Sequence, residues 1–186
     1  MEEKRFSQLK KLRITRNQWR SILKWALYTL SLVGILVLQS VILSRLPVLG
    51  AKVNLVPWFV GCVCFIEGPD SGSIFALLAS LIWALSGGDL GFVSILVLTF
   101  GGMGIGLLVQ KVFRRQVLMC MACCLLLSLC HESAIFALRL YLHTVTPTQY
   151  FHILIPGVLL GIPACPVFFY LCRAIYRTEG GRIWNE

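Results

Sequence analysis

Acidic residues and long polar stretches are both scarce in this sequence. The 186 residues include 8 Asp and Glu against 17 Lys and Arg, and only 13% are charged while 58% are hydrophobic. With a mean hydropathy of +0.81, the chain has no room for a separate soluble domain, and its composition is typical of polytopic membrane proteins. The net charge of +9 does not indicate nucleic-acid binding, because the basic residues flank apolar runs. A membrane surface with anionic lipid is the simpler partner.

The sequence also lacks a complete catalytic motif. His131-Glu132 begins like a zinc-protease H-E-x-x-H, but Ile135 stands where the second histidine would have to be. The glycine run at residues 101–106, GGMGIG, lacks the Lys and the Ser or Thr of a phosphate-binding loop, so helix packing is the better interpretation. We predict no catalytic residue, no cofactor and no enzymatic activity.

Metal-binding motifs are incomplete as well. Cys120 and Cys123 have the spacing of a metal clamp, but no second pair accompanies them, and all eight cysteines fall inside apolar runs. Buried cysteines usually behave as small hydrophobic residues. We therefore predict no metal site.

The apolar runs predict an all-α polytopic membrane protein with six transmembrane helices. A basic segment at 1–24 precedes the membrane domain at 25–172, and a basic tail at 173–186 follows it. The first segment is either an interfacial helix or a solvated tail that only sets topology. We expect spans at 25–43 and 55–66, two within 71–110, and two more at 117–138 and 151–172. The second is short, so a membrane hairpin turning back at 67–70 is an alternative. Asn54 is expected to cap it.

The basic residues predict the orientation. Of the 17 lysines and arginines, all but Arg45, Lys52 and Arg139 lie in the N-terminal segment, in the turn after the fourth span or in the tail. Six spans with both termini cytoplasmic therefore satisfy the positive-inside rule.

Small residues recur at every fourth position in three of the spans. They are Gly72, Ala76, Ser80 and Ala84 in the third span, Gly102 and Gly106 in the fourth, and Gly157 and Gly161 in the last. Because no hydrophobic force joins helices in lipid, such strips let backbones approach closely. We predict that they pack the bundle or receive a partner's helix, and packing within the chain is at least as well supported for any one strip.

Glu132 is the intramembrane polar residue that needs an explanation. A carboxylate within a span must face protein, reach a cation such as Arg45 or Lys52, or take up a proton. We predict that it holds the outer end of the bundle, or a partner's helix, through a buried polar contact; binding of an ion or a substrate is the alternative.

The order of several motifs resembles MreD, the rod shape-determining membrane protein family. Gln39 is followed by a proline-bearing short span, by Glu67-Gly68-Pro69-x-x-Gly72 and by Leu85-Ser86-Gly87-Gly88-x-Leu90-Gly91. The order continues with a glycine-rich span that ends in Lys111-x-Phe113-Arg114-Arg115. It is completed by Glu132. The similarity covers residues 39–142. One departure is Trp83, where the family often has Asp.

The resemblance implies a non-enzymatic subunit of the bacterial cell-wall elongation machinery in the cytoplasmic (inner) membrane. MreD-like proteins associate with the bitopic protein MreC and, through it, with the class B penicillin-binding transpeptidase, RodA and MreB, supporting peptidoglycan synthesis and cell shape. MreD also resembles, in fold, the S component of energy-coupling-factor vitamin transporters, and such a component is the alternative function. The Ala-x-x-x-Ala pattern by which those proteins dock their coupling subunit is missing here, because Leu30 follows Ala26.

Overall fold

The computed structural model describes residues 16–41, 54–86, 91–111, 116–142, 157–159 and 161–178. These residues are largely helical, with no strand among them. The helices are α2 (Arg16–Val41), α3 (Val56–Glu67), α4 (Pro69–Leu85), α5 (Gly91–Lys111), α6 (Val117–Tyr141) and α8 (Ala164–Thr178). Arg45 and Lys52, the cations considered as partners of Glu132, lie outside the described residues. The proline at position 156 does too.

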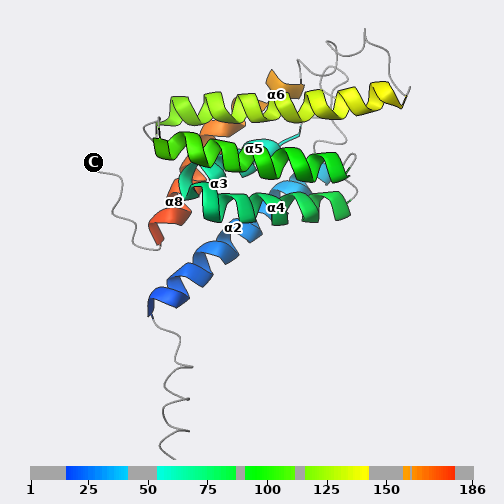
Figure 1. Ribbon diagram of the computed structural model, residues 1–186. Helices are drawn as coiled ribbons and strands as arrows, with labels where there is room; N and C mark the ends of the chain where they lie inside the picture. The colour runs from blue at the N-terminus through cyan, green and yellow to red at the C-terminus, as the bar shows by residue number, and fades with distance from the viewer. Residues whose placement is uncertain are drawn as a thin grey trace, which may run out of the picture.

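Helix α3 forms the centre of the bundle (Figure 1). It contacts α2, α4, α5, α6 and α8, and these five helices contact one another in the ring α4, α5, α6, α8, α2 and back to α4. Every residue from Val56 to Ile66 is buried. The sequence VPWFVGCVCFIE permits this position, because a helix that is apolar on all sides can be enclosed by other helices without burying an unpaired charge.

Among the described residues, four helical stretches are long and apolar enough to span a membrane, which makes this an α-helical membrane protein. They are Gln18–Val41, Gly91–Lys111, Val117–Tyr141 and Gly157–Thr178. The first begins before the predicted start at Trp25, and the last extends past the predicted end at Cys172. Helices α3 and α4 are shorter. At 1.5 Å per residue, α3 covers about 18 Å of a hydrocarbon layer about 30 Å thick. Since other helices enclose it, α3 need not match the thickness of the lipid.

Gly68 reverses the chain between α3 and α4. Its φ of 90° lies in the left-handed region that glycine adopts without strain, and its N–H donates to the carbonyl of Cys64. Pro69 then begins α4 at a position where its missing N–H has no consequence. The two helices run back along each other, with the Phe59 and Phe75 ring centroids 6.1 Å apart. The chain therefore turns where the sequence predicted, at residues 67–70.

The small-residue strips lie at contacts within the chain. A Cβ on Gly72 would be 2.8 Å from the Cα of Cys64, one on Gly102 3.2 Å from the Cβ of Ala76, and one on Gly106 2.5 Å from the Cα of Pro69. Such distances leave no space for a side chain, so α3, α4 and α5 approach with their backbones close together.

The remaining members of the strips are placed less uniformly. Ser80 is buried, and Ala84 lies against Gly91 across the contact between α4 and α5. Gly161 is covered by the indole of Trp58, whereas Gly157 is only half-buried. Most of these small residues thus contribute to packing within the chain, and a role for them in binding a partner stays a prediction.

Candidate functional site

A chain of side-chain hydrogen bonds joins three helices at one end of the bundle. Asn54 Nδ2 donates to Glu132 Oε1 over 2.6 Å, and Gln39 Nε2 donates to Asn54 Oδ1 over 3.1 Å. Gln39 Oε1 in turn accepts the backbone N–H of Leu55 over 3.1 Å. Glu132 therefore makes a polar contact within the bundle. Its partner is the side-chain amide of Asn54, just before α3.

Asn54 differs from its predicted role. Leu55 occupies the N-cap position of α3, with no side-chain cap hydrogen bond. The Gln39 side chain accepts the Leu55 N–H instead, and the Asn54 amide bridges Gln39 and Glu132. The prediction of a cap at Asn54 was therefore correct about where the helix starts. It was wrong about the capping side chain, because Gln39 accepts the backbone N–H at the helix start.

His131, next to Glu132, is fully buried against the residue that departs from the family pattern. Its Nε2 lies 3.1 Å from Ser94 Oγ, and its ring centroid lies 5.3 Å from that of Trp83. Its Nδ1 is 3.5 Å from Glu132 Oε1. Trp83 thus covers the imidazole with an apolar ring at the position where the family often has Asp.

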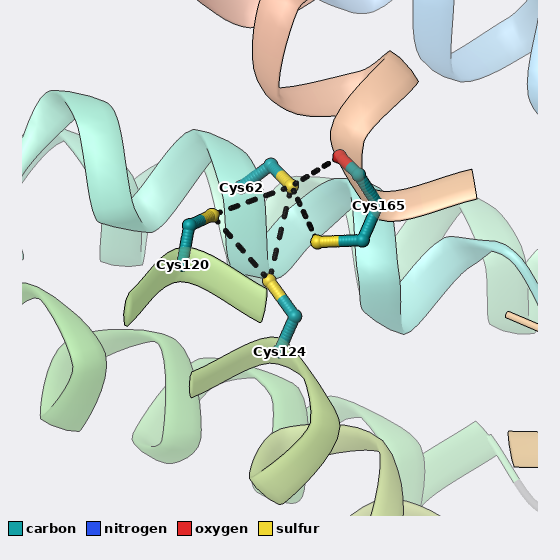
Figure 2. A group of neighbouring side chains, drawn as sticks. All are labelled: Cys62, Cys120, Cys124 and Cys165. Atoms are coloured by element: carbon teal, nitrogen blue, oxygen red, sulfur yellow. Dashed lines mark hydrogen bonds between the residues drawn. The ribbon is translucent and has the colours of Figure 1, made fainter. Parts of the chain in front are cut away.

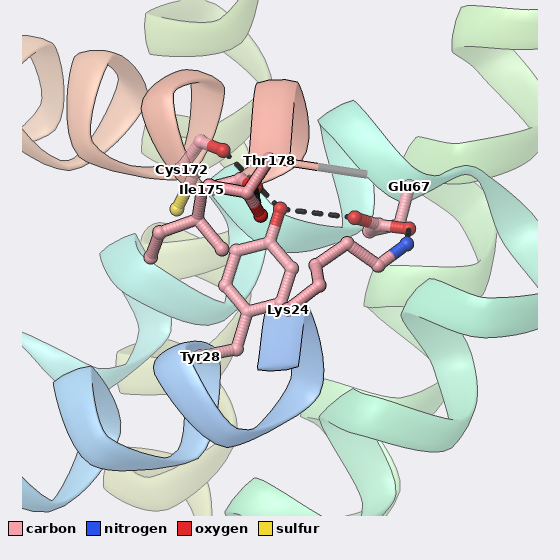
Figure 3. A network of polar contacts seen from close by, with 6 residues as sticks. All are labelled: Lys24, Tyr28, Glu67, Cys172, Ile175 and Thr178. Atoms are coloured by element: carbon pink, nitrogen blue, oxygen red, sulfur yellow. Dashed lines mark hydrogen bonds and ion pairs between the residues drawn. The ribbon is translucent and has the colours of Figure 1, made fainter. Parts of the chain in front are cut away.

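A buried ion pair occupies the opposite end of the bundle (Figure 3). Lys24 Nζ lies 2.9 Å from Glu67 Oε2, and the two side chains are only 6% and 4% exposed. The Tyr28 hydroxyl lies 2.9 Å from Glu67 Oε1 and 3.2 Å from the carbonyl oxygen of Cys172. The Lys24 ammonium also lies 5.0 Å from the ring centroid of Trp25.

This ion pair was missed by the sequence analysis. Lys24 was assigned to a basic segment at the membrane surface, whereas the structure buries it inside the bundle. The available signal was that Lys24 and Glu67 have opposite charges and both lie at span ends that the predicted topology places on the same side. The pair connects α2 to the end of α3, and Tyr28 extends the connection to α8.

Four cysteine thiols meet in the interior, as Figure 2 shows. Cys62 comes from α3, Cys120 and Cys124 from successive turns of α6, and Cys165 from the first turn of α8; all four are buried. Their sulfur atoms all lie within 4.8 Å of one another. We call this group the four-cysteine cluster. No pair in it is a disulfide.

The cluster corrects the interpretation of the cysteine motif. Cys123, the second half of the Cys120-x-x-Cys123 spacing, is not a member, whereas Cys124 is. Residues four apart share a helix face, so Cys120 and Cys124 point together. The second pair, which the sequence motif lacks, comes from two other helices.

An apolar groove lies between α2 and α4. It has a volume of about 500 Å³. It is lined by Trp25, Thr29, Leu32, Ser71, Ile74, Phe75, Leu78, Ala79 and Ile82. The α2 and α4 pair makes the least extensive contact in the ring around α3. We call this feature the α2–α4 groove, and it is where the ring of described helices is least closed.

Comparisons of the chain with protein-family models, with curated proteins and with solved structures find no significant match. The resemblance to MreD therefore depends on the order of the motifs alone, and the function must be argued from the geometry of the bundle.

Proposed function

We propose that this protein is a non-enzymatic membrane subunit of the bacterial cell-wall elongation complex, with six spans and both termini cytoplasmic. In this proposal it binds MreC and through it acts with the transpeptidase, RodA and MreB. The α2–α4 groove is the observation that carries the proposal, because it is an apolar opening at the weakest contact in the ring of described helices around α3.

The residues behind the resemblance support the proposal through what they do in the bundle. Gln39 and Glu132 belong to one hydrogen-bond chain, and Glu67 belongs to the buried ion pair. Gly68 makes the reversal between α3 and α4, and Gly72 permits their close approach. The motif residues thus hold helices together, as expected of positions that specify a common fold.

The lining of the α2–α4 groove favours a helix over a polar ligand. Thr29 and Ser71 supply its hydroxyl groups and Trp25 an indole, and the other lining residues are aliphatic or aromatic hydrocarbons. A vitamin site needs several polar groups that fix the ligand. A single apolar transmembrane helix, such as that of MreC, needs only an apolar groove with small residues for close approach, and the partly exposed Ser71 provides one such position.

Filling the groove tests this assignment. Leu78 is 50% exposed and lines the groove, whereas its neighbour Leu77 is 45% exposed and does not line it. Leu78→Trp should reduce co-purification with the MreC-like partner by about tenfold or more, because filling the groove removes favourable helix contacts. Leu77→Trp is the matched control and should retain the partner. Equal retention by both variants would contradict the assignment.

Cell shape tests the function itself. Depleting the protein in its native bacterium should turn rods into spheres, with growth restored by the wild-type chain. Undisturbed rods with a nutrient requirement, together with tight retention of a vitamin by the purified protein, would indicate the transporter component instead.

A further inference from the structure

The four sulfur atoms of the cluster have the spacing of a tetrahedral metal site. Cys62 Sγ lies 3.8 Å from that of Cys124, 3.9 Å from that of Cys165 and 3.7 Å from that of Cys120. The Cys120 and Cys124 sulfurs are 3.9 Å apart. A tetrahedron with zinc–sulfur bonds of about 2.3 Å has edges of about 3.8 Å. These four distances match those edges, and the two remaining distances, from Cys165 Sγ to the sulfurs of Cys120 and Cys124, are within 4.8 Å. The four matching distances are nearly twice the length of a disulfide bond, about 2.05 Å.

The composition of the site favours zinc. Four thiolates in a tetrahedral arrangement are the ligand set of a structural zinc ion. An iron–sulfur cluster places several irons and sulfides between its cysteines, and therefore requires sulfur atoms that are farther apart. Calcium and magnesium bind oxygen ligands, and none is part of this group.

We propose that Cys62, Cys120, Cys124 and Cys165 bind one Zn²⁺ ion. Binding replaces four S–H bonds by four zinc–sulfur bonds and releases four protons, so the complete site carries two negative charges. Cys165 lies in the first turn of α8, where the positive end of the helix dipole stabilises negative charge. The other three thiolates are held by α3 and α6, the helices on which α8 packs.

The role of the ion is structural. With four protein ligands the zinc has no open position for water or a substrate. It connects α3, α6 and α8 along residues 56–66 of α3, which are all buried and carry no charged side chain. The site therefore adds a fixed, directional link in the middle of a bundle whose central helix is otherwise held by polar contacts at its two ends, at Leu55 and at Glu67.

Metal analysis of the purified full-length protein tests the proposal. After growth with zinc and purification without chelators, the wild type should contain about one zinc ion per chain. Cys62→Ser and Cys124→Ser should each lower this to about a tenth or less, because a four-thiolate site with one weak ligand binds far less tightly. Cys64→Ser and Cys123→Ser are matched controls, since both cysteines are buried on the same two helices outside the cluster; they should retain the ion.

Cobalt spectroscopy decides the case even where a variant fails to fold. Metal-free wild-type protein titrated with Co²⁺ should develop the intense visible bands of tetrahedral cobalt thiolate, and Zn²⁺ should abolish them. Three results would each overturn the proposal: wild-type protein without zinc and without these bands, full zinc content in folded Cys62→Ser, or copper or iron in place of zinc.

Discussion

Asn54 and Glu132 are joined by a 2.6 Å hydrogen bond that connects the start of α3 to the second half of α6. The two residues are far apart in the sequence, and the contact fixes where the central helix begins relative to the surrounding ring. Glu132 is 23% exposed at its side chain, so the bond lies at the rim of the bundle rather than in its centre.

Removing the Glu132 acceptor should destabilise the protein. Glu132→Ala leaves the Asn54 amide without its partner, which should cost about 1–3 kcal/mol, whereas Glu132→Gln keeps an oxygen acceptor and should cost less. Thermal unfolding in detergent, followed by size-exclusion chromatography, measures both. Leu126→Ala, at an exposed position of α6, is the control for loss of side-chain volume. A Glu132→Ala protein as stable as that control would show that the hydrogen bond is dispensable.

The Lys24–Glu67 pair should be costly to break from either side. Lys24→Met leaves a buried carboxylate and Glu67→Gln leaves a buried ammonium, and each should destabilise by about 3–5 kcal/mol. The double variant should lose less than the sum of the two, because neither charge is then left unpaired. A double-mutant cycle of unfolding free energies measures this coupling. Strictly additive losses would mean that the two charges act independently.

Two glycines of α5 offer a matched test of the contact between α4 and α5. A Cβ on Gly106 would lie 2.5 Å from the backbone N and Cα of Pro69, whereas nothing lies within 4 Å of one on Gly104. Gly106→Ala should therefore separate the helices and destabilise the bundle by about 1–3 kcal/mol. Gly104→Ala should be neutral or slightly stabilising, because alanine favours the helix. Comparable melting temperatures for the two variants would show that close backbone packing at Gly106 is not needed for stability.

The proposed orientation makes a prediction about topology. Alkaline phosphatase fused after Lys111 or after Thr178 should be inactive, and fused after Leu142 it should be active, because only the last junction is expected outside. Blotting for the fusion proteins controls for their amount. Activity after both Leu142 and Thr178 would place the two ends of the last span on the same side and would reject six spans.

The sequence predicted those features that depend on neighbouring residues. The apolar runs located the helices, and Gly68-Pro69 located the reversal between α3 and α4, because glycine permits a positive φ and proline fixes φ and lacks an N–H donor. The strips at Gly72 and Gly102 indicated close approach of helices, because small residues at every fourth position leave one helix face nearly free of side chains. The sequence did not predict that α3 is the central helix. The unbroken apolar sequence of residues 56–66 is compatible with that position.

Features that depend on which helices become neighbours could not be predicted. Cys62 and Cys165 meet Cys124 only because α3 and α8 both pack on α6, and no spacing within one helix encodes that meeting. The Lys24–Glu67 pair has the same origin. Charge at the end of a span is ordinarily assigned to the membrane surface, and only the three-dimensional arrangement shows that Lys24 turns inward.

The enclosed position of α3 has a consequence for biogenesis. Phe168 lies 5.7 Å from Phe59 between ring centroids, and Phe169 lies 6.3 Å from Phe65, so α8 covers one flank of the central helix. Since α8 is the last of the described helices to leave the ribosome, α3 lacks its cover on that flank until α8 has been synthesised. The central helix can therefore be fully enclosed only after α8 has entered the bundle.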